Sequence, residues 1–455
     1  MLYRTNVILL LSIILQTSAM GQIDSLNMVS DTTIVQGDST LIVMDSSIVA
    51  PTKLEVLNHN IDSLVAMAIR QEAFPGCVIY SIYKGEELFR KAYGFHTYDS
   101  LQPDNFDDIF DLASVSKNTG GVLSIMKLYE MDLINLDDPI KKYVSHMGWS
   151  KQGKSTIREA MAHQAGLKAW IKFHEDIKKK NGKYKARTIS DKPSDDYPFR
   201  VSEGKYVHKD FYTKVKKMIK KSAFNKEKKY TYSDLFFYLV PEIVKNLSGM
   251  EYEDFLKYYY YDSLGASTIG FNPLLRYDSI EIVPTEIDTF FRMENIHGTV
   301  HDEGAILMKG VSGHAGLFAN ATDLAKVWQM LLNGGEFEGK RYLDKATIAL
   351  FSAYQYPSNE SRRGLGFDKP LLVYDSLLSS VAKDASIYSF GHSGYTGTFV
   401  WVDPKYDLLY IFLSNRVYPT REHRAIYQLN VRPQIHTWLY DYIKQDDCIR
   451  PEDTE

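Results

Sequence analysis

The sequence predicts an α+β fold in which a mixed, mainly antiparallel sheet is built from both chain ends, with flanking helices and an inserted helical lobe. Strand-like apolar runs occur near the start of the chain, at 77–83 and 87–93, and near its end, at 398–402 and 408–413. The residues between these runs have mostly helical spacing, so we expect the two ends to supply the sheet. A hydrophobic content of 44% and a charged content of 24% are typical of a globular protein.

The first 53 residues are expected to precede the folded domain. Arg4 provides a positive start, Val7 to Leu15 form a short apolar run, and Thr17-Ser18-Ala19 supplies small residues before a cleavage site. We therefore expect a signal peptide over 1–21 and export to the periplasm or the medium. Residues 22–53 are rich in Ser, Thr, Asp and Val and are expected to form a flexible spacer. An uncleaved signal would keep the chain at the membrane, but no cysteine directly follows the apolar run to carry a lipid.

The folded domain is expected to span 54–445, followed by a polar tail at 446–455. Its first helix is predicted at 54–69, where apolar residues recur at helical spacing. The first two strands are expected to form a hairpin around Lys84-Gly85-Glu86. Further helices are predicted at 120–130, 157–162, 234–247, 252–260, 321–332 and 426–443. Residues 168–229 are the least regular part of the middle region.

Composition excludes some classes of function. The net charge of -4 gives no electrostatic reason to expect a nucleic-acid partner. The only cysteines are Cys77 and Cys448, and whether they form a disulfide stays open. The run His301-Asp302-Glu303, together with His314, matches no recognised metal-ligand spacing. We expect these residues to be structural, and we expect neither a metal nor a cofactor.

The first sign of chemistry is Ser114-Val115-Ser116-Lys117, where the apolar spacing indicates that a helix begins. Residues three apart share a helical face, so the Lys117 ammonium can reach the Ser114 hydroxyl. A serine hydroxyl is a weak nucleophile at neutral pH and needs such a neighbour. Further Ser-x-x-Lys matches begin at Ser81, Ser124, Ser202 and Ser380. Only Ser114 stands at a junction between an extended or loop segment and a helix, so we select it as the candidate nucleophile.

Two more short motifs follow in order. Tyr232-Ser233-Asp234 precedes a helical run, and His392-Ser393-Gly394 precedes a strand-like run. Ser-x-x-Lys, then Tyr-x-Asn, then Lys-Thr-Gly is the order of motifs in serine β-lactamases and penicillin-binding proteins. The chain resembles this superfamily over about 54–445, and most closely its class C β-lactamase and esterase branch. It also resembles the serine-hydrolase module that follows β-N-acetylglucosaminidase domains in some Bacteroidetes-type proteins.

The resemblance implies a β-lactamase/transpeptidase-like fold and a role for each motif. Ser114 would be the nucleophile and Lys117 its proton partner. Tyr232 would exchange protons with the serine and the leaving group. The backbone N–H groups of Ser114 and Tyr395 would form the oxyanion hole, which is often the largest single catalytic contribution.

Substrate is expected to contact Asp234 and the segment His392-Ser393-Gly394, where the chain departs from the family pattern. Asp234 replaces an Asn, so an amide donor is lost. His392 replaces a Lys, and a neutral imidazole is expected to donate one hydrogen bond to substrate or to Tyr232 rather than to anchor a carboxylate. Both changes argue against efficient β-lactam hydrolysis. Arg362 and Arg363 are expected to be a surface pair rather than a carboxylate-binding site.

Together these observations predict an exported serine hydrolase that acts through an acyl-enzyme on ester or amide substrates. Small molecules and cell-wall peptides are the expected substrates. Two alternatives stay open: a non-hydrolytic penicillin-binding or sensing module of the same fold, and a true β-lactamase, which His392 disfavours. The sequence leaves the oligomeric state open.

Overall fold

The computed structural model describes residues 51–447 of the chain. The expected signal peptide, nearly all of the expected spacer and most of the polar tail lie outside the described residues, as does Cys448. Cys77 is buried in the first strand of the central sheet. The disulfide and the boundaries of the terminal segments therefore stay predictions.

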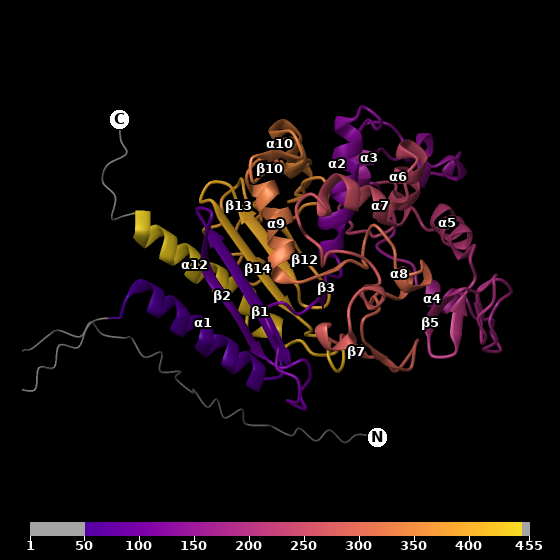
Figure 1. The fold of residues 1–455 in the computed structure, drawn as a ribbon. Helices are drawn as coiled ribbons and strands as arrows, with labels where there is room; N and C mark the ends of the chain where they lie inside the picture. The colour runs from indigo at the N-terminus through magenta and orange to yellow at the C-terminus, as the bar shows by residue number, and fades with distance from the viewer. Residues whose placement is uncertain (1–50, 448–455) are drawn as a thin grey trace, which may run out of the picture. The chain divides into compact units, whose positions relative to one another are not determined.

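A five-stranded sheet forms the centre of the fold, in the order β12-β13-β14-β1-β2 (Figure 1). Its strands are β1 (Gly76–Tyr83), β2 (Glu86–Gly94), β12 (Phe390–Ser393), β13 (Phe399–Asp403) and β14 (Leu408–Ser414). β1 and β14 lie next to each other, with Cys77 opposite Ser414 and Tyr83 opposite Leu408. The prediction of a sheet built from both chain ends is confirmed. All four neighbouring pairs are antiparallel, so this sheet is purely antiparallel rather than mixed.

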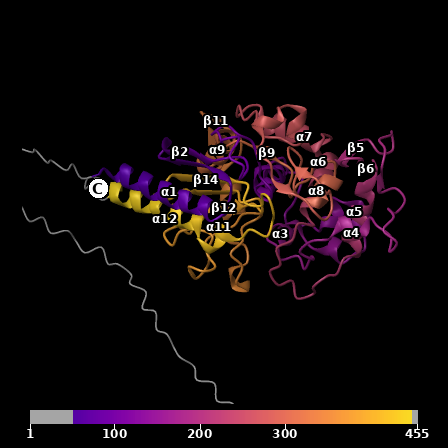
Figure 2. The same ribbon diagram turned by 90° about the horizontal axis from the view of Figure 1, so that it is seen from below.

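The two faces of the sheet are covered by different helices, because side chains alternate along a strand. On one face, Leu409, Ile411 and Leu413 of β14 join the core that includes α9 (Ala321–Leu332). On the other face, Leu408, Tyr410 and Phe412 pack in the core formed with α1 (Lys53–Arg70) and α12 (Val431–Asp447). α1 and α12 lie side by side in both ribbon views (Figures 1 and 2). The first and last helices therefore cover the same face.

The middle of the chain forms the inserted lobe. Its helices are α2 (Leu123–Glu130), α3 (Ile157–Met161), α4 (Phe173–Asp176), α5 (Phe211–Lys221), α6 (Val240–Ser248), α7 (Tyr252–Leu256), α8 (Glu303–Leu307) and α10 (Lys345–Ser352), while α11 (Ala425–Gln428) precedes the last helix. In Figure 1, α2, α3, α6 and α7 gather away from α1 and α12. The lobe is mainly helical, as predicted.

Short strands also occur in this region. β3 (Phe110–Asp111) pairs with β9 (Phe318–Ala319), β7 (Glu286–Ile287) with β8 (Asn295–Ile296), and β10 (Glu336–Phe337) with β11 (Lys340–Arg341). β4 (Ile189–Ser190), β6 (Lys205–Val207) and β5 (Phe199–Ser202) form a small sheet within the irregular region 168–229. Two- to four-residue strands are too short to leave a clear alternating pattern in the sequence, so they were not predicted.

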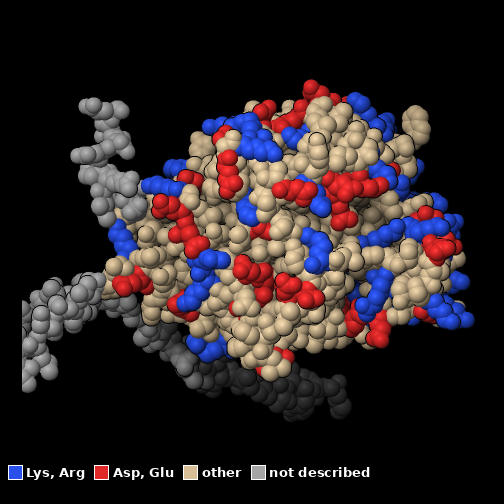
Figure 3. All heavy atoms as spheres, in the orientation of Figure 1, with Lys and Arg blue, Asp and Glu red and all other residues tan. Residues whose placement is uncertain are grey.

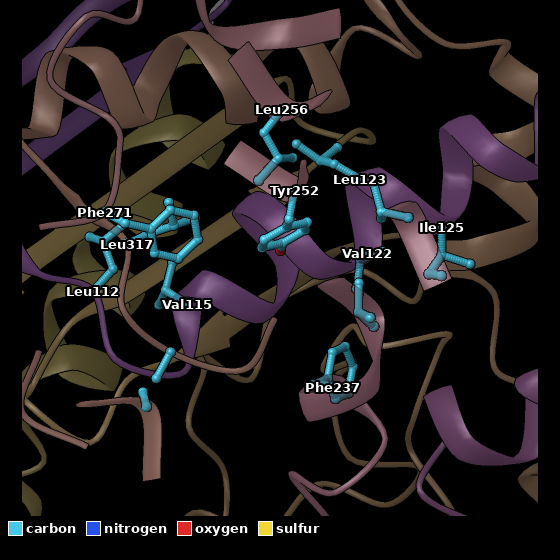
Figure 4. Close-up of a cluster of buried hydrophobic side chains, with 14 of the residues drawn as sticks. Leu112, Val115, Val122, Leu123, Ile125, Phe237, Tyr252, Leu256, Phe271 and Leu317 are labelled. Carbon is cyan, nitrogen blue, oxygen red and sulfur yellow. The ribbon is translucent and has the colours of Figure 1, made fainter. Parts of the chain in front are cut away.

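The helix that follows Ser114 is packed unusually tightly into the lobe. It contains a π-helical turn at Lys117–Val122 and continues into α2. A Cβ atom on Gly120 would lie 2.8 Å from Tyr252 Oη, and one on Gly121 would lie 2.7 Å from the Gly313 carbonyl. Figure 4 shows Val122 and Leu123 of this helix among buried apolar side chains. The Gly-Gly pair therefore lets this helix approach its neighbours closely.

The surface is mixed in charge. Figure 3 shows Lys and Arg interspersed with Asp and Glu over the face in view. Among the helices of residues 51–447, none has both the length and the apolar run that a membrane span requires.

Candidate active site

Ser114 stands between β3 and the helix that leads into α2. Its Oγ lies 2.9 Å from Lys117 Nζ, and Ser114 is partly exposed whereas Lys117 is fully buried. The preceding residue, Ala113, has φ of +44°, in the left-handed region that residues with a Cβ rarely adopt. Asp111 Oδ1 accepts a hydrogen bond from the Ala113 N–H at 2.8 Å and supports this turn. The local fold thus presents the Ser114 hydroxyl at the surface beside a buried ammonium.

Lys117 is held by two further groups. Its Nζ lies 2.7 Å from Asp234 Oδ1 and donates to the His314 carbonyl at 3.3 Å. Burial lowers the pKa of Lys117, but the charge of Asp234 and the interaction with Tyr232 outweigh burial and hold this pKa above its ordinary value. Lys117 is therefore an ammonium at neutral pH and donates its hydrogen bond to Ser114 Oγ.

Tyr232 packs near the same ammonium. Lys117 Nζ is 5.0 Å from the centre of the Tyr232 ring. Burial raises the pKa of Tyr232 and the charge of Lys117 opposes this, with a raised value as the net result. The ring packs against His163 at a centroid distance of 4.6 Å, and His163 Nδ1 accepts from the Ser233 N–H at 3.1 Å. The tyrosine is therefore a neutral phenol on a fixed loop.

His392 lies on β12 and is buried. Its Nδ1 is 2.8 Å from the Ser393 carbonyl, so Nδ1 carries the hydrogen, because a carbonyl can only accept. Its Nε2 lies 3.4 Å from Arg363 Nη1 and accepts from it. Burial lowers the pKa of His392 to about 3, since Arg363 and Lys117 oppose the raising effect of Asp368. The expectation that His392 donates to substrate or to Tyr232 is wrong, because its donor is turned to its own strand.

The position of Arg363 differs from the expectation that Arg362 and Arg363 form a surface pair. Its side chain is 4% exposed, and its Nη1 lies 2.6 Å from Asp368 Oδ1, so it is not part of a surface pair. Its Nε donates to Tyr230 Oη at 3.2 Å, and its guanidinium carbon is 5.0 Å from the centre of the Tyr232 ring. The buried Arg363 guanidinium therefore lies next to both the Tyr232 ring and the His392 imidazole.

The candidate oxyanion donors are brought together by threonine hydroxyls. Thr396 Oγ1 donates to the Asp111 carbonyl at 2.8 Å, and Thr398 Oγ1 donates to the Leu112 carbonyl at 3.0 Å. These bonds join the β12–β13 connection, which carries Tyr395, to the segment before Ser114. Within residues 51–447, the backbone N–H groups of Ser114 and Tyr395 have no protein acceptor. Both donors remain available to a ligand, as an oxyanion hole requires.

Gly394 has a packing role at this junction. Its N–H donates to the Thr398 carbonyl at 2.7 Å. A Cβ atom on Gly394 would lie 2.0 Å from Thr398 Oγ1 and 2.6 Å from the Leu112 carbonyl. The glycine therefore allows close approach of the two segments, while Ser393 beside it is only half-buried.

The structure gathers Ser114, Lys117, Tyr232 and Asp234 in one place, and the centre of the His392 ring lies 6.1 Å from that of Tyr232. Sequence reasoning missed Asp111, Thr396, Thr398 and the buried position of Arg363. Thr396 and Thr398 lie in the turn between β12 and β13, where the alternation of strand faces does not apply, so the sequence offered no signal for them. No pattern in the sequence indicated that Arg363 is buried either, because its burial depends on how distant segments pack.

The fold and this site define a member of the serine β-lactamase and penicillin-binding protein superfamily. The sequence model of the Beta-lactamase family matches residues 57–432, and the chain belongs to that family.

Among curated proteins, the chain is similar to one of Escherichia coli O157:H7 that is named provisionally as a D-alanyl-D-alanine carboxypeptidase. The two are 28% identical over 371 residues, which cover 75% of this chain and 79% of that protein. A protein of the same provisional name from Salmonella enteritidis is 26% identical over 423 residues, covering 85% of this chain and 90% of that protein.

Solved structures share the fold. A penicillin-binding protein homologue from Caulobacter crescentus has a TM-score of 0.59 at 16% identity, covering 86% of this chain and 98% of that one. EstCE1, a hydrolase with promiscuous acyltransferase activity, has a TM-score of 0.59 at 18% identity, covering 84% and 99%. A class C β-lactamase from Rhodobacter sphaeroides has a TM-score of 0.57 at 15% identity, covering 85% and 99%. The predicted β-lactamase/transpeptidase-like fold is confirmed.

Proposed function

We propose that this protein is an exported serine hydrolase that forms an acyl-enzyme on Ser114 and releases it with water. The observation that carries this proposal is the distance of 2.9 Å between Ser114 Oγ and Lys117 Nζ, with Tyr232 and Asp234 packed around the same ammonium. The N–H groups of Ser114 and Tyr395 stabilise the oxyanion that forms when Oγ bonds to the substrate carbonyl carbon.

The ion pair suggests a route for the serine proton. Lys117 is charged in the resting site, so it takes the Ser114 proton only as it gives one of its own to Asp234, 2.7 Å away. Asp234 then holds the proton, and Lys117 stays an ammonium beside the new oxyanion. When the C–O or C–N bond of the substrate breaks, Tyr232 protonates the leaving group and regains its proton from Asp234 through Lys117. Water repeats the sequence in reverse order to free Ser114.

The charges of the site favour some substrates over others. His392 is neutral, and the Arg363 charge is balanced by Asp368 at 2.6 Å. Substrates with a neutral group near β12 are therefore favoured over penicillins, which bring a carboxylate. Neutral esters are the substrate class that these charges favour. Short cell-wall-type peptides are a second proposed class, supported by the names of the bacterial relatives, and the charge argument favours those that are cleaved at an internal amide bond and so carry no carboxylate near β12.

The test is a comparison of three substrates with the purified protein: a neutral aryl ester, a peptide ending in D-alanyl-D-alanine, and a penicillin. Continuous turnover of the ester with a higher kcat/KM than for penicillin is the expected result. A single stoichiometric burst would instead favour the sensing module, and faster turnover of penicillin would favour a β-lactamase. Labelling with a fluorophosphonate, followed by peptide mass mapping, should place the adduct on Ser114.

Export is a separate part of the proposal. The apolar run Val7 to Leu15 and the small residues after it support cleavage near residues 19–22. The intact mass of protein recovered from the cell envelope should lack these residues. Recovery of the full-length chain from the cytoplasm would contradict export without bearing on the hydrolase chemistry.

A further inference from the structure

A second cluster of polar side chains lies in the loop between β2 and β3, where the proposed hydrolase mechanism makes no use of it. The loop folds back so that Phe95 and Pro103 form an antiparallel bridge. This places His96, Asp104 and Asp108 together, all three buried, with one ligand atom of each within 4.8 Å of the others. His96 Nε2 lies 2.8 Å from Asp108 Oδ2 and 3.9 Å from Asp104 Oδ1.

Asp104 is the member of the cluster that has no explanation as a structural residue. Its side chain is 0% exposed, and within residues 51–447 neither carboxylate oxygen has a hydrogen-bond partner. A buried carboxylate without a partner is strongly unfavourable. Gly76 lies against it, and a Cβ atom on Gly76 would be 2.3 Å from Asp104 Oδ2. The absence of a side chain at Gly76 is therefore what makes room for this carboxylate.

The cluster also has an excess of negative charge. Asp104 and Asp108 are two buried acids beside one imidazole. Both carboxylates are buried, and a buried negative charge must be compensated inside the protein. Such a pair is neutralised either by a proton on Asp104 or by a cation between the carboxylates. Asp104 Oδ1 already faces His96, the one nitrogen donor of the group.

We propose that His96 Nε2, Asp104 Oδ1 and Asp108 Oδ2 bind one divalent transition-metal ion of the Zn²⁺ type. Imidazole nitrogen with carboxylate oxygen is a donor set that suits Zn²⁺, and two carboxylates balance its charge. Metal–ligand bonds of about 2.0–2.2 Å place neighbouring donors roughly 3–4 Å apart. The two distances from His96 Nε2, 2.8 Å and 3.9 Å, lie close to this range.

The ion has a structural role at this position. The Asn105 N–H donates to Asp108 Oδ2 at 2.6 Å, and Asn415 Nδ2 donates to the His96 carbonyl at 2.8 Å. The cluster therefore joins the loop to the residue that follows β14 and to the start of β3, which leads to Ser114. Bound metal would hold the segment before the candidate nucleophile without touching the substrate. This site departs from the sequence-based expectation of no metal, and it does not depend on the proposed hydrolase function.

The experiment uses untagged protein, because a polyhistidine tag binds the same ion. After dialysis against a chelator, the protein is incubated with Zn²⁺ and passed through gel filtration, and its metal content and melting temperature are measured. One Zn²⁺ retained per chain and a higher melting temperature are expected, and Co²⁺ in place of Zn²⁺ should give a visible absorption band. Asp104→Asn should retain none. The control Asp107→Asn removes the same charge from an exposed neighbouring position and should bind like the wild type.

Two results would overturn the proposal. One is wild-type protein that retains no Zn²⁺ and whose melting temperature is unchanged by Zn²⁺ or chelator, which would mean that a proton alone neutralises Asp104. The other is Asp104→Asn protein that binds Zn²⁺ as the wild type does. If Asp104→Asn does not fold, the wild-type titration alone decides. Ser114→Ala protein should bind the ion normally, so this outcome is separate from that of the hydrolase proposal.

Discussion

Arg363 Nη1 lies 3.4 Å from His392 Nε2, and because a guanidinium can only donate, the histidine is the acceptor. In the family pattern a lysine stands at the position of His392 and faces the substrate. Here the side chain on β12 is a neutral imidazole, and the positive charge lies behind it in a pair with Asp368 at 2.6 Å. The Arg363 charge therefore lies close to the Tyr232 ring and pairs with Asp368 inside the protein. It does not anchor a substrate carboxylate.

The assignment of the nucleophile predicts a complete loss of chemistry in Ser114→Ala. This variant should lose fluorophosphonate labelling and ester turnover while keeping its circular dichroism spectrum, because only a partly exposed hydroxyl is removed. Ser124→Ala is the matched control, since Ser124 also begins a Ser-x-x-Lys match but its Oγ is buried and donates to the Gly120 carbonyl at 3.0 Å. Stoichiometric labelling of Ser114→Ala would show the assignment to be wrong.

Tyr232→Phe tests the proton donor. Acid–base assistance is worth ~10²–10⁴ in rate, so kcat should fall by about that factor. The ring packing with His163 is kept, so the melting temperature should change little. Lys117→Ala should be at least as damaging to kcat. An unchanged kcat in Tyr232→Phe would reduce the tyrosine to a packing residue.

Asp234→Asn tests the proton route through its pH dependence. The carboxylate raises the pKa of Lys117, so its loss should lower that pKa. It also removes the acceptor for the Lys117 proton, so the variant can work only when Lys117 is already neutral. The kcat/KM of Asp234→Asn should therefore rise with pH, about tenfold per unit, up to the lowered pKa of Lys117, whereas the wild type should be flat near neutral pH. Identical pH profiles would rule out this route.

The buried ion pair predicts a non-additive effect on stability. Arg363→Met removes the contact of 2.6 Å to the buried Asp368 carboxylate and leaves it only the longer contact to Arg362 at 3.4 Å, so it should lower the free energy of unfolding by up to about 3–5 kcal/mol. Arg363→Met/Asp368→Asn removes both charges and should recover a large part of that loss. Urea unfolding of the two variants measures the difference. A double variant no more stable than Arg363→Met would mean that the charge pair is not the cause.

His436 on α12 predicts a loss of stability in acid. It is fully buried, and burial lowers its pKa from 6.5 to about 3. Below pH 6.5 His436 is protonated in the unfolded chain but stays neutral in the folded chain. The free energy of unfolding therefore falls as pH falls, by about 1.4 kcal/mol per pH unit from pH 6.5 to about 3. His436→Gln should reduce the slope of unfolding free energy against pH over this range. The exposed His59→Gln should leave the slope unchanged.

The sequence by itself determined the features that depend on local geometry. Ser114 and Lys117 are three residues apart at the start of a helix, and backbone geometry alone brings their side chains together. Apolar runs near both ends determined that the central sheet is built from β1, β2, β13 and β14. The order of the three short motifs led to the family, since motif order depends on the chain and not on its packing.

Only the tertiary structure decided which distant residues meet. Asp234 reaches Lys117 from another part of the chain, Arg363 is buried behind His392, and Asp104 is enclosed with His96 in a loop. Each of these contacts depends on how separate segments pack, and no periodicity in the sequence records it. Packing also sets burial, and burial decides whether a charged side chain is solvated at the surface or must find a partner inside. For this reason the sequence indicated the reacting groups, whereas the structure showed the charges that surround them.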